Sequence, residues 1–215
     1  MSTFLHRLRS SLPSKGFTLT ELVVVIAIMT VLTGVFLTQQ QQFDSTTLLR
    51  SLSYSMALSI RQAQTYGVSV RSFEGTFAEA HGIQFVQGLS EYYLFADIDP
   101  LPNGDRMRDA LNGSEDVETF GLTGQKFTIS DFCALPVGTG QSERCTDQID
   151  SLTILFIRPN PDACIATSYS PTACVAGDPG EKYQSARIQL QGPGGATRSV
   201  TIRNTGQISV GKLGS

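Results

Sequence analysis

Apolar and charged positions divide the chain sharply near its N-terminus. Residues 22–43 carry no charge, and most positions up to Leu37 are aliphatic or aromatic. A helix needs about 20 such residues to cross the hydrocarbon core of a bilayer. The pattern therefore predicts a transmembrane segment at about residues 20–40, preceded by a leader of residues 1–16.

The helical pattern continues beyond this apolar stretch. Apolar side chains recur every three or four positions at Leu49, Leu52, Met56, Ile60 and Ala63. This spacing places them on one stripe of an amphipathic helix. Gly67 interrupts the pattern, and glycine readily adopts the left-handed conformation of a helix C-cap. We expect one helix over residues 17–66, whose second half packs on a sheet.

Residues 67–215 are predicted to form a β-rich head domain. The expected strands are 83–87, 92–96, 126–130, 152–158, 186–190, 199–203 and 207–210. Residues 88–91 are expected to join the first two strands as a hairpin, and residues 204–206 to form a tight turn between the last two. Alternating apolar residues in the late strands predict one face covered by the helix and one in water. The predicted fold class is α+β, a long N-terminal helix against an antiparallel sheet.

The charges of the N-terminal region predict the orientation of the transmembrane segment. Arg7, Arg9 and Lys15 precede the segment without an acidic residue among them, which places the N-terminus on the cytoplasmic side. The head domain is then periplasmic or extracellular. The net charge of the whole chain is −3, and loss of the basic leader makes it more acidic, which argues against a general nucleic-acid binder.

Four cysteines follow the membrane segment, at Cys133, Cys145, Cys164 and Cys174. Their spacings lack the close pairs typical of zinc sites. An even number of cysteines in an exported domain predicts two disulfides. Of the three connectivities, the sequential one, Cys133–Cys145 with Cys164–Cys174, closes the shortest loops. We expect these bridges to matter most in residues 159–181, which are rich in proline and glycine and are predicted to contain little regular structure.

The junction between the leader and the apolar stretch reads Lys-Gly-Phe-Thr-Leu-Thr-Glu from Lys15 to Glu21. It resembles the N-terminal signal of type IV pilins and of the pseudopilins of type II secretion. The resemblance implies that prepilin peptidase cleaves between Gly16 and Phe17 and that Phe17 is N-methylated. It also implies that Glu21 meets the N-terminal amine of a neighbouring subunit during assembly. The alternatives are an ordinary signal peptide, and a Glu21 carboxylate that only reaches water at the membrane edge.

Two later segments narrow the resemblance. Residues 49–71 and 200–210 are similar to the amphipathic half-helix and the final hairpin of H-type minor pseudopilins and related minor pilins. Thr38 stands where many major pilins have a proline, which also favours a minor subunit. The resemblance implies a structural subunit, and not an enzyme, of a type II secretion pseudopilus or a type IV pilus. Its implied partners are prepilin peptidase, other pilins, an inner-membrane assembly platform and membrane lipid.

The sequence leaves open whether the protein binds calcium or DNA, and whether it joins a filament at all. Oxygen-bearing side chains cluster at Asp97, Asp99, Asn103 and Asp105, and they are either calcium ligands or parts of an ordinary turn. No other cofactor is expected. Basic residues Arg187, Arg198, Arg203 and Lys212 form the DNA contact of an alternative, a minor pilin for DNA uptake. The remaining alternative is a membrane-anchored extracytoplasmic domain that joins no filament.

After the leader, His81 is the single histidine of the sequence, so one subunit has no histidine pair for catalysis.

Overall fold

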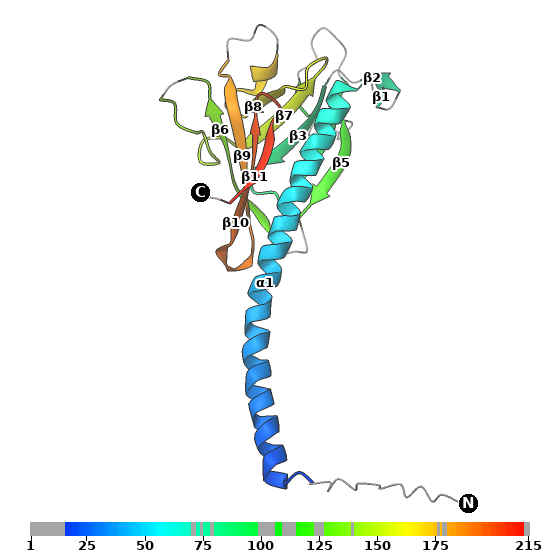
Figure 1. The fold of residues 1–215 in the computed structure, drawn as a ribbon. Coiled ribbons are helices and arrows are strands. Elements are labelled where there is room, and N and C mark those ends of the chain that lie inside the picture. The colour runs from blue at the N-terminus through cyan, green and yellow to red at the C-terminus, as the bar shows by residue number, and fades with distance from the viewer. Residues whose placement is uncertain are drawn as a thin grey trace, which may run out of the picture. The chain divides into compact units, whose positions relative to one another are not determined.

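The computed structural model describes residues 16–69, 72–73, 75–77, 80–98, 106–108, 115–122, 127–138, 140–175, 177 and 180–212. The chain divides into two compact units, residues 1–41 and 42–215. Helix α1 (Leu19–Val68) contributes its first part to one unit and its second part to the other. The α+β fold with a long N-terminal helix is therefore confirmed (Figure 1).

The head unit contains two larger antiparallel sheets and one small ribbon, where the sequence had predicted a single sheet. The five-stranded sheet has the order β5 (Asp116–Gly121), β4 (Glu91–Asp97), β3 (Ala80–Val86), β7 (Ser151–Ile157) and β8 (Ala163–Thr167). The four-stranded sheet has the order β11 (Ile208–Gly211), β10 (Thr197–Arg203), β9 (Tyr183–Gln191) and β6 (Thr128–Pro136). Strands β1 (Ser72–Phe73) and β2 (Thr76–Phe77) form the ribbon. The short 3-10 helices are η1 (Pro171–Cys174) and η2 (Pro193–Gly195).

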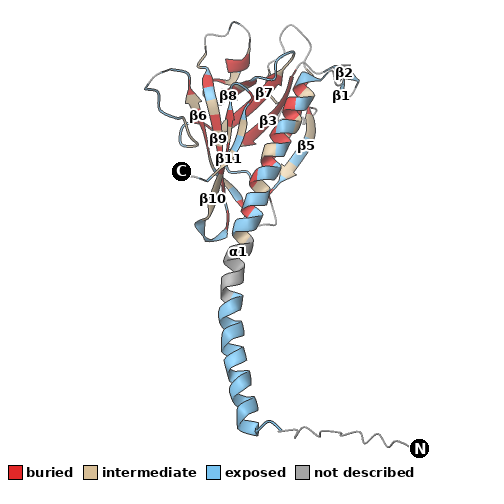
Figure 2. Ribbon diagram, in the orientation of Figure 1, coloured by how far each residue is buried: buried red, intermediate tan, exposed pale blue. Residues whose placement is uncertain are grey.

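The core of the head unit lies between the second half of α1 and the inner faces of the sheets (Figure 2). The predicted helical stripe is confirmed at its centre, because Met56, Ile60 and Ala63 have no exposed surface. In β9 and β10 the alternating residues Ile188, Leu190, Val200 and Ile202 are also buried. The period-2 pattern therefore identified the covered face of this sheet correctly.

Gly67 has a different role from the predicted C-cap. It lies inside α1, one residue before its end, and its φ is not positive. A Cβ atom at Gly67 would come 2.4 Å from the carbonyl oxygen of Phe156 on β7. The glycine is needed because the helix passes very close to the backbone of that strand.

Gln64 joins the helix to two loops of the head. Its side-chain amide donates to the carbonyl oxygens of Pro161, at 2.7 Å, and Gly206, at 3.3 Å. Gly206, with φ 76°, completes the predicted turn between β10 and β11. One buried amide thus satisfies backbone acceptors from segments far apart in the sequence.

The segment 159–181 contains more regular structure than its proline and glycine content predicted. Strand β8 pairs with β7, and η1 follows it. Residues Ala166, Ala173 and Cys174 from this segment pack with Phe95 and Leu155 in a second hydrophobic cluster. The cluster covers the face of the five-stranded sheet that points away from α1.

Candidate processing and assembly site

Thr18 caps the N-terminus of α1. Thr18 precedes the helix, and its hydroxyl accepts a hydrogen bond from the backbone N–H of Glu21 at 3.3 Å. The same hydroxyl also lies 3.5 Å from the Glu21 carboxylate, to which it donates. The Thr18 hydroxyl thus satisfies one free backbone donor of the first helical turn, as an N-cap threonine does. The negative charge of Glu21 also lies at the positive end of the helix dipole.

The sequence interpretation assigned a role to Glu21 but none to Thr18. The signal was present in the sequence, because Thr-x-x-Glu directly before an apolar run is the usual pattern of a capping box. The structure therefore adds Thr18 to the predicted set Gly16, Phe17 and Glu21. Phe17 lies directly before the cap, and 81% of its surface is exposed.

The apolar half of the helix is exposed in the described part of the chain. The segment from Leu19 to Leu37 has a mean hydropathy of 2.3 and is long and apolar enough to cross a membrane. All of its side chains are exposed (Figure 2). Such a surface requires a lipid bilayer or other helices around it, because so large an apolar area is unfavourable in water.

Polar side chains within this segment form hydrogen bonds inside the helix. The hydroxyl of Thr30 donates to the carbonyl oxygen of Ile26 at 2.7 Å, and that of Thr33 donates to Met29 at 2.7 Å. Internal bonding of this kind allows threonine to lie in hydrocarbon without unpaired hydroxyl groups. Between residues 16 and 37 the sequence then has one charged side chain, Glu21.

A comparison with protein families matches residues 13–37 to the prokaryotic N-terminal methylation motif. The matched region ends at Leu37, where the apolar segment also ends. The match supports a pilin-like protein that is anchored in the membrane by this helix and processed by prepilin peptidase. None of the curated proteins and none of the solved structures compared with the chain matches it.

The four cysteines lie in two disulfides in the head unit. The structure bonds Cys133 to Cys145 and Cys164 to Cys174. The first disulfide ties β6 to the loop that precedes β7, and the second ties β8 to η1. This is the sequential pairing among the three that the sequence allowed. Disulfides of this kind are typical of compartments outside the cytoplasm.

Of the four residues suggested as calcium ligands, the structure describes Asp97. Asp97 is buried at the end of β4, and Glu115 is buried nearby, where its carboxylate accepts a hydrogen bond from the N–H of Ile98 at 3.3 Å. Asp99, Asn103 and Asp105 lie outside the described residues. Calcium binding stays a prediction.

The basic residues suggested as DNA contacts are divided between two faces of the four-stranded sheet. Arg198 lies on the same face of β10 as Val200 and Ile202. Lys212 lies opposite Arg198, because the neighbouring positions Ser199 and Gly211 are paired between β10 and β11. Arg203 and Arg187 belong to the opposite face, and Arg187 forms an ion pair with Glu143. The structure therefore does not bring the four residues together as one phosphate-binding surface.

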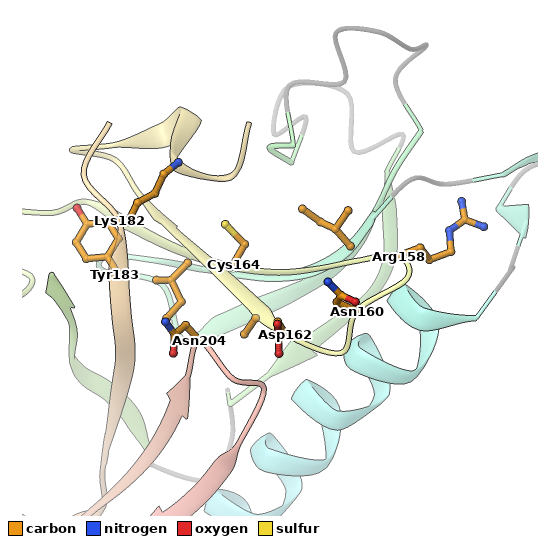
Figure 3. A pocket seen from close by; sticks show the side chains of 10 residues that line it. Arg158, Asn160, Asp162, Cys164, Lys182, Tyr183 and Asn204 are labelled. Atoms are coloured by element: carbon orange, nitrogen blue, oxygen red, sulfur yellow. The ribbon is translucent and has the colours of Figure 1, made fainter. Parts of the chain in front are cut away.

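A hollow with both polar and apolar side chains opens where the loop after β7, strand β8 and the turn after β10 meet (Figure 3). Its lining residues are Ile157, Arg158, Asn160, Asp162, Ala163, Cys164, Ile165, Lys182, Tyr183 and Asn204. Cys164 is held in a disulfide, and the hydroxyl group of Tyr183 lies 2.9 Å from that of Thr167. Burial raises the pKa of Tyr183 and keeps it protonated at neutral pH.

Proposed function

We propose that the chain is the precursor of a pilin-like filament subunit, of the minor pilin and pseudopilin type. Prepilin peptidase cleaves it between Gly16 and Phe17, and the new N-terminal amine of Phe17 is methylated. The apolar helices of neighbouring subunits then bundle in the filament. The observation that carries the proposal is the methylation motif at residues 13–37, which coincides with an exposed apolar helical surface.

Glu21 has a specific part in this proposal. A lone carboxylate in hydrocarbon is costly, and pairing with an ammonium group removes much of that cost for both groups. The Thr18 hydroxyl donates to one oxygen of the Glu21 carboxylate, which leaves acceptor capacity for another donor. A methylated terminal amine keeps its positive charge. The carboxylate of one subunit can therefore pair with the Phe17 amine of the next.

The proposal places the leader in the cytoplasm and the head on the far side of the cytoplasmic membrane. The leader carries Arg7, Arg9 and Lys15, and cytoplasmic ends of membrane helices favour such residues. The two disulfides of the head agree with this orientation. The assembled filament belongs to a type II secretion system or a type IV pilus, with the membrane assembly platform and other pilins as partners.

The first test is the intact mass and N-terminal sequence of the protein from its native membrane, with and without prepilin peptidase. We expect a chain that begins at methylated Phe17 when the peptidase is present and at Met1 when it is absent. Retention of residues 1–16 in the presence of the peptidase would contradict the proposed processing. The best interpretation would then be an uncleaved membrane anchor.

A matched pair of variants separates helix capping from charge pairing at Glu21. Glu21→Gln keeps the backbone N–H that Thr18 caps, and a side-chain oxygen that can accept from the Thr18 hydroxyl, but removes the charge. Thr18→Ala removes the cap, at a cost of about 1 kcal/mol to the helix, and keeps the charge. We expect both variants to be cleaved, but Glu21→Gln to enter filaments at least about tenfold less than Thr18→Ala, because its amide cannot neutralise an ammonium group. Equal incorporation of the two variants would exclude charge pairing as the function of Glu21.

A further inference from the structure

An apolar groove runs along one flank of α1 in the head unit. It is lined by Tyr54, Ala57, Leu58 and Arg61 of α1 and by Ile208 and Val210 of β11. Leu58 has 69% of its surface exposed and Tyr54 has 48%. Strand β11 is the outermost strand of its sheet in the described part of the chain. The groove thus combines exposed apolar side chains with a strand edge, and such edges readily pair with another strand.

Basic side chains surround this groove. Arg61 lines it, and its guanidinium donates to the neutral amide of Gln64. The guanidinium of Arg50 lies 5.9 Å from the centre of the Tyr54 ring. Lys212 follows Val210 at the end of β11 and is exposed. Among the residues whose side chains are described, none of these three cations forms an ion pair with a carboxylate.

The other flank of α1 has the opposite charge. Strand β5 lies there, as the outermost strand of the five-stranded sheet (Figure 1). Its Glu118 is exposed and accepts a hydrogen bond from Gln62 of α1 at 3.3 Å. Asp116 on the same strand is already paired with Arg108. Glu118 therefore places an exposed negative charge against α1 on this flank.

We propose that the groove binds the β5 edge of a second copy of this chain, with Arg61 of one copy paired with Glu118 of the next. The charges are complementary, and both edges are outermost strands beside the same helix. Because the two surfaces lie on opposite flanks of one molecule, the contact is heterologous and repeats from copy to copy. Such contacts generate rings or helical filaments. This inference rests on the proposed filament function and adds a partner and a contact in the head to it.

Cross-linking between two tagged copies tests the contact directly. Two full-length versions are produced together in the native cells, one with Leu58→Cys and the other with Thr119→Cys, which is exposed on β5 beside Glu118 and leaves its charge in place. The membranes are then treated with a short bismaleimide. The native cysteines are all in disulfides, so the introduced thiols react selectively. We expect a cross-linked dimer that carries both tags and requires prepilin peptidase. Val137→Cys in place of Leu58→Cys is the control, because Val137 is exposed at the end of β6, away from the groove.

Charge reversal provides a second readout that does not depend on the cross-linker. Arg61→Glu and Glu118→Arg should each lower the fraction of protein in filaments by about tenfold, because like charges then face each other in every contact. The double variant restores opposite charges in every contact and should recover most of the loss. Arg203→Glu changes an exposed cation on the outer face of β10 and should have no effect.

The outcomes separate this contact from the proposed function. If Thr119→Cys protein is cleaved and enters filaments but gives no doubly tagged dimer, and the charge variants assemble normally, the contact is wrong and the filament function stands. Adducts with other proteins alone would also exclude a second copy as the occupant. If no copy is cleaved or enters filaments, the proposed function fails, and the contact fails with it.

Discussion

The two halves of helix α1 use similar apolar residues in opposite ways. Met29 in the first half has 61% of its surface exposed, whereas Met56 in the second half has none. Complete burial of such a side chain contributes about 1.5–3 kcal/mol. The head therefore draws its stability from contacts within the single chain. The first half must obtain the corresponding free energy from lipid or from neighbouring helices.

The largest expected effect comes from truncating one methionine in each half. Met56→Ala should lower the free energy of unfolding of the head by about 3 kcal/mol, because it leaves a cavity among α1 and the sheets. Met29→Ala should leave that value unchanged, because the Met29 side chain is exposed and its truncation leaves no cavity. Chemical denaturation of the full chain in detergent, followed by circular dichroism, measures both variants. A similar loss of unfolding free energy in the two variants would show that both halves of α1 contribute equally to the stability of the head.

A pair of glycines in the same helix gives a smaller but sharper contrast. A Cβ atom at Gly67 would meet the Phe156 backbone, whereas one at Gly34 has no neighbour within 4 Å. Gly67→Ala should therefore destabilise the head by about 2 kcal/mol, since the helix must move away from β7. Gly34→Ala should not affect the head, although alanine is the better helix former by about 1 kcal/mol. Unchanged stability of Gly67→Ala would indicate that the close approach to Phe156 is not required.

The sequence predicted the helix, the late strands and the turn at Gly206 because each depends on local pattern. The apolar run at residues 22–37 and the alternation around Ile188 and Val200 identify their elements without knowledge of distant partners. Gly67 shows the limit of this reasoning. A glycine near a helix end fits a C-cap, and only the position of β7 reveals that close packing is its role.

The missed strands show why tertiary context was needed. Strand β5 has the sequence Asp-Val-Glu-Thr-Phe-Gly, and its charges and glycine give a weak strand signal. Strand β8 lies in the Pro- and Gly-rich segment and forms because β7 offers it an edge. The candidate site residues differ in the same way. Thr18 and Glu21 form a local pattern that the sequence already contains, but the basic residues of β9 and β10 could be assigned to faces of the sheet only once the strand register was known.

The smallest expected effect concerns an ion pair that fixes loops of the head. Arg144 donates two hydrogen bonds to Glu181, the longer at 2.9 Å, and its guanidinium lies 4.1 Å from the centre of the Tyr169 ring. The bonds from Arg144 hold the pKa of Glu181 below its ordinary value of 4.5. The pair therefore stabilises the head above that value, and the contribution is lost as the pH falls through the lowered pKa.

Arg144→Met tests this contact. At about pH 7 the variant should be less stable than the native protein by about 1 kcal/mol, since the pair is partly exposed to solvent. The difference should shrink as the pH falls below about 4.5 and through the lowered pKa of Glu181, because proton binding to this carboxylate in the native protein breaks the ion pair. Denaturation of both proteins across this range measures it, with Met29→Ala as the control whose difference from native should stay near zero. A stability difference that does not change with pH would assign the effect of Arg144 to its packing on Tyr169 instead of to its charge.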